Sequence, residues 1–178
     1  VLEKGDIDLL ATASNASLLV SAVTTLPGIT KVLAAGDTKA SIRIDAGIQV
    51  DLRIVSASEW GAAMLYFTGS KEHNVLLRQR ARERKLRLNE YGLFRTTDDD
   101  DSYVAGKNED ELYAALDLPL FAPELREARK EFEWAENNAL PELITTADIR
   151  GDLHMHTTAS DGKHSLEEMV EAARQRGL

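Results

Sequence analysis

Hydrophobic and polar positions alternate at the start of the chain. In residues 5–11, Ile7 and Leu9 point one way while Asp6 and Asp8 point the other. Because successive side chains of a strand lie on opposite faces, this pattern predicts a half-buried strand with two carboxylates on its exposed face. The second arm of a predicted hairpin repeats the alternation, with Asp51 among its polar positions.

The rest of the first third predicts a sheet with one helix. Ser14 or Asn15 is placed to cap a helix that ends before Pro27-Gly28. We expect strands over residues 29–35, 41–44 and 48–55. The last two flank Asp45-Ala46-Gly47, a hairpin signal whose glycine can adopt a positive φ.

From residue 58 onward the pattern becomes mainly helical. We expect helices over residues 59–66, 71–84, 109–116 and 124–138. Between them we expect a short strand over 86–94 with turn points at Asn89 and Gly92, a hairpin return at Tyr103-Val104 and an extended segment over 118–123. A linker over 141–150 and a new strand from Gly151 follow. The run Asp98–Asp101 lacks the spaced ligands of a calcium loop, so a solvated turn is expected there. The fold class is therefore α/β (α+β).

Composition narrows the classes of protein. The chain is 43% hydrophobic, which suffices for a packed core, and no apolar run approaches the ~20 residues of a membrane span. No cysteine is present, which excludes disulfides and thiol catalysis. The N-terminal residues lack the layout of a secretion signal, so we expect a cytoplasmic protein. The sequence leaves the oligomeric state open.

Charge is unevenly distributed over a net value of −9. Residues 71–95 hold eight basic and three acidic side chains, a local balance of +5, whereas residues 96–150 hold five basic and fifteen acidic ones, a balance of −10. A basic segment in an acidic protein is compatible with a local contact to a phosphate backbone. A solvated helix face explains the charge equally well.

Three aspartates are candidates for a metal site. If the strand with Asp51 lies beside the first strand, Asp6, Asp8 and Asp51 converge on one edge of the sheet. Neighbouring carboxylates repel one another unless a cation compensates them, and Mg²⁺ suits oxygen ligands shared with substrate phosphates. Such a site would perform phosphoryl or nucleotidyl transfer. Two exposed aspartates on a solvated strand face are the alternative.

Several motifs carry a resemblance to a known family. GDIDLL, GDTKASIRI, VDLRIV, YFTGSKEHNVLLR and LNEYGLF follow one another at residues 5–10, 36–44, 50–55, 66–78 and 88–94. Their order resembles that of family X DNA polymerases, in particular the bacterial type with a C-terminal PHP domain. The resemblance implies a nucleotidyltransferase palm over residues 1–57, a mixed helix and hairpin thumb over 58–123, a linker helix and linker over 124–150, and the first strand and helix of a PHP (β/α) barrel over 151–178.

The resemblance also implies roles for the acidic residues. Asp6 and Asp8 would bridge two ions, Mg²⁺ or Mn²⁺, while Asp51 would bind the catalytic ion nearest the primer 3′-OH. The partners would be gapped or primer–template DNA and a dNTP. Gly5 would let phosphate oxygens approach the strand end, and Arg53 would either serve the substrate or form an ion pair with Asp8.

Further substrate contacts are implied along the next two helices. Tyr66, Phe67 and Gly69 would shape the pocket for the nucleotide sugar, although an aromatic pair that ends a helix is the plainer interpretation. Asn74 and Arg78 are four apart and so share one helix face, from which they would contact the minor groove.

The sequence HMHTTASDG at the other end resembles the first motif of PHP phosphoesterases. There His154, His156 and Asp161 would contribute to a cluster of Mn²⁺ or Zn²⁺ ions, incomplete in this chain. An ordinary pair of strand histidines is the alternative. The competing function is thus a metal-dependent 3′–5′ exonuclease or phosphoesterase whose front half binds DNA. His73 and His164 have no identifiable partner and are expected at the surface.

Elements that relatives carry before the first aspartate are missing from this sequence, as are the later ligands of a PHP site. We therefore expect an internal fragment of a longer polymerase, inactive or weakly active alone. Residues 151–178 are expected to pack poorly or to be held by a neighbouring molecule, and a well-ordered intramolecular core around Leu153 would contradict this.

Overall fold

The computed structural model describes residues 5–96 and 101–178. The chain forms two compact units with their boundary between Leu140 and Pro141, within the expected linker. Of the predicted acidic turn, residues 98–100 lie outside the described residues, and Asp101 begins a strand.

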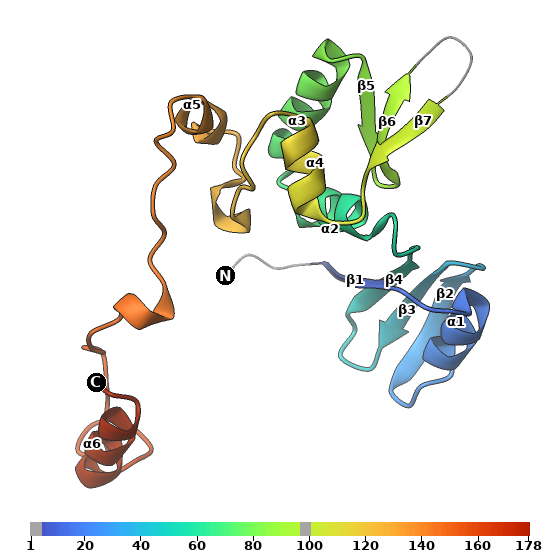
Figure 1. The fold of residues 1–178 in the computed structure, drawn as a ribbon. Coiled ribbons are helices and arrows are strands. Elements are labelled where there is room, and N and C mark those ends of the chain that lie inside the picture. The colour runs from blue at the N-terminus through green and yellow to red at the C-terminus, as the bar shows by residue number, and fades with distance from the viewer. Residues whose placement is uncertain (1–4, 97–100) are drawn as a thin grey trace. The chain divides into compact units, whose positions relative to one another are not determined.

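The first sheet has four strands in the order β1-β4-β3-β2 (Figure 1). Its strands are β1 (Asp6–Ala11), β2 (Ile29–Ala35), β3 (Lys39–Ile44) and β4 (Gln49–Ile54). β1 runs parallel to β4, while the other pairs are antiparallel, so the sheet is mixed. Gly47 closes the β3–β4 hairpin at a φ of 77°, as expected from its sequence.

Helix α1 (Ala16–Thr24) covers part of one face of this sheet. Asn15 caps it by accepting a hydrogen bond from the backbone N–H of Leu18 at 2.9 Å. Val20 is buried against the side chains of β3 and β4. The edge strand β1 gains less cover, and Ile7 and Leu9 remain 43% and 48% exposed. The alternation therefore predicted the strand correctly and its burial incorrectly.

The remainder of the first unit combines helices with a three-stranded antiparallel sheet. Its elements are α2 (Trp60–Thr68), α3 (Lys71–Glu83), β5 (Leu86–Asn89), β6 (Gly92–Thr96), β7 (Asp101–Ala105), α4 (Glu109–Ala115) and α5 (Glu131–Glu136). The turn points expected at Asn89 and Gly92 are confirmed, and the segment 86–94 is a hairpin rather than one strand. Asn89 accepts the N–H of Tyr91 where the chain reverses. Leu77, Leu93 and Leu112 are fully buried in the core that these elements share.

The helix expected over residues 124–138 is wrong for its first half. A short 3-10 turn, η1 (Pro123–Leu125), precedes an irregular segment, and α5 starts only at Glu131. Ala128 adopts a φ of 54°, which no α-helix admits. The carboxylate of Glu131 accepts the N–H groups of Ala128 and Arg129 at 2.7 and 2.8 Å and so fixes the irregular backbone. Tertiary contacts thus override the helical pattern of charges.

The second unit contains the 3-10 turn η2 (Thr146–Asp148) and helix α6 (Leu166–Gln175). The strand expected from Gly151 does not form, because a strand requires a hydrogen-bonded neighbour and the described residues 141–178 include none. None of these described residues is buried, and Leu153 is 101% exposed. The expected poor packing of this segment is confirmed.

Candidate functional site

The parallel pairing of β1 with β4 brings two of the predicted carboxylates side by side. In the register, Asp8 is opposite Asp51 and Asp6 is opposite Gln49. Residues in register lie on the same face of a sheet, so Asp6, Asp8 and Asp51 share one face. Leu52 and Ile54 point to the opposite face, where they pack with Val20 of α1.

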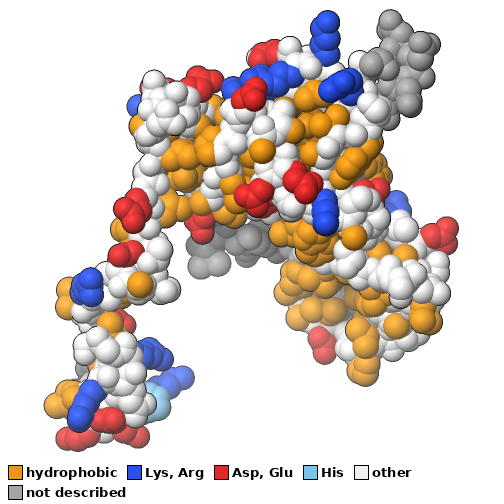
Figure 2. Space-filling view, viewed as in Figure 1, with side chains coloured by type: hydrophobic (Ala, Val, Ile, Leu, Met, Phe, Trp, Pro, Cys, Tyr) orange, Lys and Arg blue, Asp and Glu red, His pale blue; other side chains and the backbone are white. Residues whose placement is uncertain are grey.

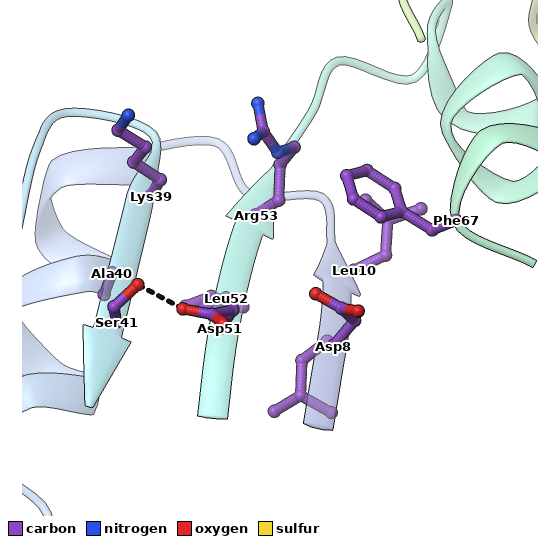
Figure 3. A pocket seen from close by; sticks show the side chains of 10 residues that line it. Asp8, Leu10, Lys39, Ala40, Ser41, Asp51, Leu52, Arg53 and Phe67 are labelled. Atoms are coloured by element: carbon purple, nitrogen blue, oxygen red, sulfur yellow. Dashed lines mark hydrogen bonds between the residues drawn. The ribbon is translucent and has the colours of Figure 1, made fainter. Parts of the chain in front are cut away.

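The carboxylate of Asp51 has two donors from the same sheet. Ser41 on β3 is its partner in the antiparallel register and donates its hydroxyl to Oδ1 (Figure 3). Gln49 donates its side-chain amide to Oδ2 at 2.8 Å. Both hold the carboxylate in one orientation on the strand. The sequence reasoning missed Ser41, although the turn at Gly47 fixes a hairpin register that places it there.

A pocket of about 310 Å³ lies over this edge, and we call it the carboxylate pocket. Its walls include Asp8, Leu10, Lys39, Ser41, Asp51, Arg53 and Phe67 (Figure 3). The guanidinium carbon of Arg53 lies 5.4 Å from the centre of the Phe67 ring, within the range of a cation–π interaction. In residues 5–96 and 101–178, no ion pair joins Arg53 to Asp8, so this expected alternative is wrong. Lys39 is a second cation of the wall that the sequence reasoning did not single out.

Asp8 and Asp51 line the carboxylate pocket, and Asp6 lies on the same sheet face outside its walls. These side chains offer only oxygen ligands, which suit a hard divalent cation. Asp6 and Asp8 are exposed and Asp51 is half-buried, so solvent and ions reach all three. Within the described part of the chain, no three His, Asp or Glu side chains gather closely enough to hold a metal ion. The structure therefore brings two carboxylates together and leaves Asp6 two residues further along the same face.

A second pocket, of about 430 Å³, is formed where α2 meets α3. We call it the Tyr66 pocket; its walls are Tyr66, Phe67, Thr68, Gly69, Ser70, Lys71, Asn74 and Arg78. Gly69 ends α2 at a φ of 75°, and its peptide bond to Ser70 is cis. Ser70 then caps α3 by accepting the N–H of His73.

Asn74 and Arg78 lie on one face of α3, as predicted. The side-chain amide of Asn74 donates to the carbonyls of Leu65 and Tyr66 at 3.3 and 3.1 Å, and Asn74 is 8% exposed. Arg78 donates Nε–H to the carbonyl of Asn74 at 3.3 Å. Asn74 thus ties the start of α3 to two carbonyls near the end of α2 and fixes the backbone that carries Tyr66.

The expectation that His73 lies at the surface is wrong. His73 is fully buried, with Nδ1 at 2.9 Å from the Glu131 carboxylate and Nε2 at 2.8 Å from the Tyr113 hydroxyl. Burial lowers the pKa of His73, which favours a neutral ring that donates to Glu131 and accepts from Tyr113. Its partners are 40 and 58 positions away in sequence, so no local pattern could reveal them.

The carboxylate of Glu131 stays ionised in this buried network. Burial raises its pKa, but the hydrogen bonds from His73 and from backbone N–H groups outweigh burial and hold the pKa below its ordinary value. Burial also raises the pKa of Tyr113 well above its ordinary value, so its hydroxyl keeps its proton. Each polar group of the network therefore has a partner in a defined role.

The histidines of the second unit lie close together. The rings of His154 and His156 stack with centres 4.9 Å apart, and His156 Nδ1 lies 2.5 Å from a carboxylate oxygen of Asp161. This hydrogen bond holds the pKa of Asp161 below its usual range. His164 is exposed, as expected, with Nδ1 at 3.8 Å from Glu168.

Comparisons with known proteins agree with the geometry. Residues 63–127 match the family model described as DNA polymerase beta thumb. The DNA polymerase/3′-5′ exonuclease PolX of Bacillus subtilis is 38% identical over 174 residues, which are 97% of this chain and 30% of the relative. Over this span the chain is a homologue of bacterial PolX. It spans less than a third of that relative's length.

This chain shares its fold with solved structures of a polymerase beta. A Leishmania infantum polymerase beta, crystallised as a ternary P/T complex, has a TM-score of 0.56 at 24% identity, over 70% of this chain and 62% of that one. Its ternary gap complex has a TM-score of 0.55 at 22% identity, over 70% of this chain and 57% of that one. These likenesses show a mixed α/β fold with a thumb region. The matched thumb includes the whole Tyr66 pocket and continues to Glu127.

The basic segment of residues 71–95 spans α3, β5 and the start of β6. Lys and Arg side chains gather over α3 and β5 (Figure 2). Two of these arginines serve the fold: Arg80 donates to the carbonyl of Leu116 at 2.8 Å, and Arg84 donates to the carboxylate of Asp117 at 3.1 Å. Both hold the end of α4 against α3. In the residues that the structure describes, no helix is long and apolar enough to cross a membrane.

Proposed function

We propose that this chain contributes the nucleotidyl-transfer site of a family X DNA polymerase. Residues 1–57 form the palm, 58–123 the thumb, 124–150 a linker and 151–178 the start of a PHP domain. The observation that carries the proposal is the parallel register of Asp8 with Asp51 at the floor of a pocket. Homology to PolX over 97% of the chain supports it.

Asp6, Asp8 and Asp51 would hold Mg²⁺ or Mn²⁺. Their oxygen donors share one face and are open to solvent, which suits an ion that keeps water and phosphate ligands. When bound, such ions supply charge that offsets the developing negative charge of a phosphoryl transfer. Ser41 and Gln49 hold Asp51 in a fixed orientation, from which this carboxylate can accept the proton of the primer 3′-OH.

The neighbouring pockets would position the substrates. The sugar of the incoming dNTP fits the Tyr66 pocket, where Tyr66, Phe67 and Gly69 supply an aromatic wall and a backbone without a side chain. Gly5 leaves the start of β1 open for phosphate oxygens, since a Cβ there would meet nothing within 4 Å. Arg53 is a wall residue of the carboxylate pocket and would contact the phosphates of the nucleotide.

DNA would bind along the face of α3 that carries Asn74 and Arg78, next to the Tyr66 pocket. Arg78 is the better candidate for a minor-groove contact, because the amide N–H groups of Asn74 already serve backbone carbonyls. The biological setting that we propose is gap filling in DNA repair in the cytoplasm of a bacterium.

Substitution of Asp51 tests this function. In the natural protein that contains these residues, Asp51→Ala should abolish extension of a primer in a gapped duplex with Mg²⁺. Asp37→Ala is the matched control, because Asp37 is exposed in the turn before β3 and lies outside the pocket walls. Unaltered extension by Asp51→Ala would overturn the assignment.

A second activity is favoured by the cluster of His154, His156 and Asp161 in the second unit. We propose that these residues contribute ligands for Mn²⁺ or Zn²⁺ to a PHP-type 3′–5′ exonuclease or phosphoesterase. Imidazole and carboxylate donors suit these ions. Replacing both histidines with alanine should remove 3′–5′ hydrolysis and leave primer extension intact, whereas retained hydrolysis would contradict the proposal.

A further inference from the structure

The backbone of the Tyr66 pocket is tied to a segment more than fifty residues away. The N–H of Ser70 donates to the carbonyl of Arg126 at 3.0 Å. Ser70 is a wall residue of the pocket and the N-cap of α3, whereas Arg126 lies in the irregular segment before α5. One hydrogen bond therefore connects the pocket turn to a residue that lines no part of the pocket.

Arg126 is held more firmly than its position in an irregular segment would suggest. Its side chain is 1% exposed, and its guanidinium donates to the carbonyl of Phe121 at 2.8 and 3.0 Å. Two further N–H groups donate to the two carboxylate oxygens of Glu109 at 2.6 and 3.1 Å. The guanidinium carbon lies 5.5 Å from the centre of the Tyr113 ring. Such a bidentate ion pair fixes the orientation of the guanidinium and the carboxylate as well as the distance between them.

A second attachment lies three residues beyond Ser70. His73, in the first turn of α3, is bound to Glu131, and Glu131 accepts the N–H groups of Ala128 and Arg129. The segment from residue 126 to 131 is thus fixed at both ends to the start of α3. Arg126, His73 and Glu131 line no part of the pocket, and both attachments restrain the backbone that forms its wall.

We infer that Arg126 is a positioning residue for nucleotide binding, which acts by holding the N–H of Ser70 and, with it, the wall of the Tyr66 pocket. This inference rests on the proposed function of that pocket. A wall made of backbone discriminates between sugars by steric exclusion, so it does so only while it stays in place. Arg126 supplies that rigidity from outside the pocket.

Substitution of Arg126 with lysine tests the inference. Lysine keeps the charge opposite Glu109 but cannot donate to Glu109 and Phe121 together. In the 178-residue chain, amide exchange at Ser70 should accelerate about threefold to tenfold, which corresponds to the loss of one hydrogen bond. Exchange at Gly69 should change less, because its N–H donates to the carbonyl of Leu65 in α2 and not to Arg126.

Kinetics in the natural protein that contains these residues supply the second measurement. Arg126→Lys should raise KM for a dNTP by a similar factor, lower kcat less, and reduce the preference for dNTP over rNTP. Arg80→Lys is the matched control, because Arg80 also bridges a carbonyl and a carboxylate, those of Leu116 and Glu136, away from the pocket. Glu109→Gln keeps the Phe121 contacts and should give smaller changes in the same direction, which covers the case in which Arg126→Lys fails to fold.

The outcomes distinguish a failure of the role inferred for Arg126 from a failure of the proposed function. Unchanged exchange at Ser70 in both variants overturns the inference, as does faster exchange with unaltered KM and sugar preference. Equal effects of Arg80→Lys would reduce Arg126 to a general contribution to stability and also overturn it. A wild-type protein that extends no primer overturns the proposed function instead, while the exchange measurement still decides whether Arg126 holds the pocket wall.

Discussion

Two acidic clusters in the first unit use the same functional groups in opposite ways. At the β1–β4 edge, Asp8 and Asp51 lie side by side and remain open to solvent. In the buried network, Glu131 is 1% exposed and accepts from His73 and two backbone N–H groups. No cation compensates the neighbouring carboxylates of the first cluster within the described residues, whereas three hydrogen bonds compensate the carboxylate of the second. Carboxylates that lack a full set of partners therefore distinguish the candidate binding site from the structural network.

The largest expected effect is a loss of activity on substitution at the β1–β4 edge. Asp8→Asn should reduce primer extension about 10²- to 10³-fold, because it removes a charge that the transition state requires. The free energy of unfolding should stay within about 0.5 kcal/mol of the wild-type value or rise slightly, since repulsion from Asp51 is relieved. Extension assays and urea denaturation measure the two quantities; a large loss of stability would show that the acidic edge is structural.

The buried network should show the reverse pattern. Glu131→Ala should lower the free energy of unfolding by about 3 kcal/mol, because it leaves the buried ring of His73 and two part-buried backbone N–H groups without their partner. Glu133→Ala, at an exposed position of the same helix, is the control and should cost less than about 0.5 kcal/mol. Equal urea midpoints for the two variants would contradict the assigned role of Glu131.

Acid should weaken the network through His73. Its pKa in the folded protein is lowered from 6.5, so the unfolded chain takes up the proton first as the pH falls below about 6.5. Stability should therefore decline from pH 6.5 downward until the folded protein also binds the proton. Glu131 adds a separate loss only below pH 4.5, since its folded pKa is lowered from that value.

This pH dependence is measured by comparing urea midpoints at pH 7.5 and 5.5. In His73→Gln the part of the decline due to this ring should disappear, even though the variant is less stable at both values. The same decline in wild type and variant would show that His73 is not the group that titrates.

The smallest effect is expected in the second unit. Leu153→Ser should change the free energy of unfolding by less than about 0.5 kcal/mol, because Leu153 is already fully exposed. A substantial loss in thermal denaturation of this chain would reveal a packed core around Leu153 and would contradict the open arrangement.

The sequence predicted the acidic edge better than the buried network, and the reason is the range of the interactions. The alternation around Asp6, Asp8 and Asp51 is local, and the hairpin signal at Gly47 is local too. His73 meets Glu131 only because residues 118–130 fold back onto α3, which no periodicity encodes.

The failed helix over residues 124–130 has the same cause. Its charges suit a helix, but Arg126 gains more from Glu109 and Phe121 than from a helical turn. The strand expected at Gly151 fails for the opposite reason, because its local pattern is favourable and the described residues contain no partner strand for it. Local patterns thus predicted elements, and long-range contacts decided which of them formed.

The parallel pairing of β1 with β4 also sets the order in which the acidic edge can assemble during folding. Ser41 and Asp51 belong to one hairpin, whose short loop closes quickly, whereas Asp8 must join it through a crossover that includes α1 and β2. A folding intermediate with the hairpin alone would hold Asp51 correctly oriented and have no second carboxylate beside it. The divalent-ion binding proposed for this edge should therefore require the β1–β4 pairing, which would make the ion a reporter of the assembled sheet.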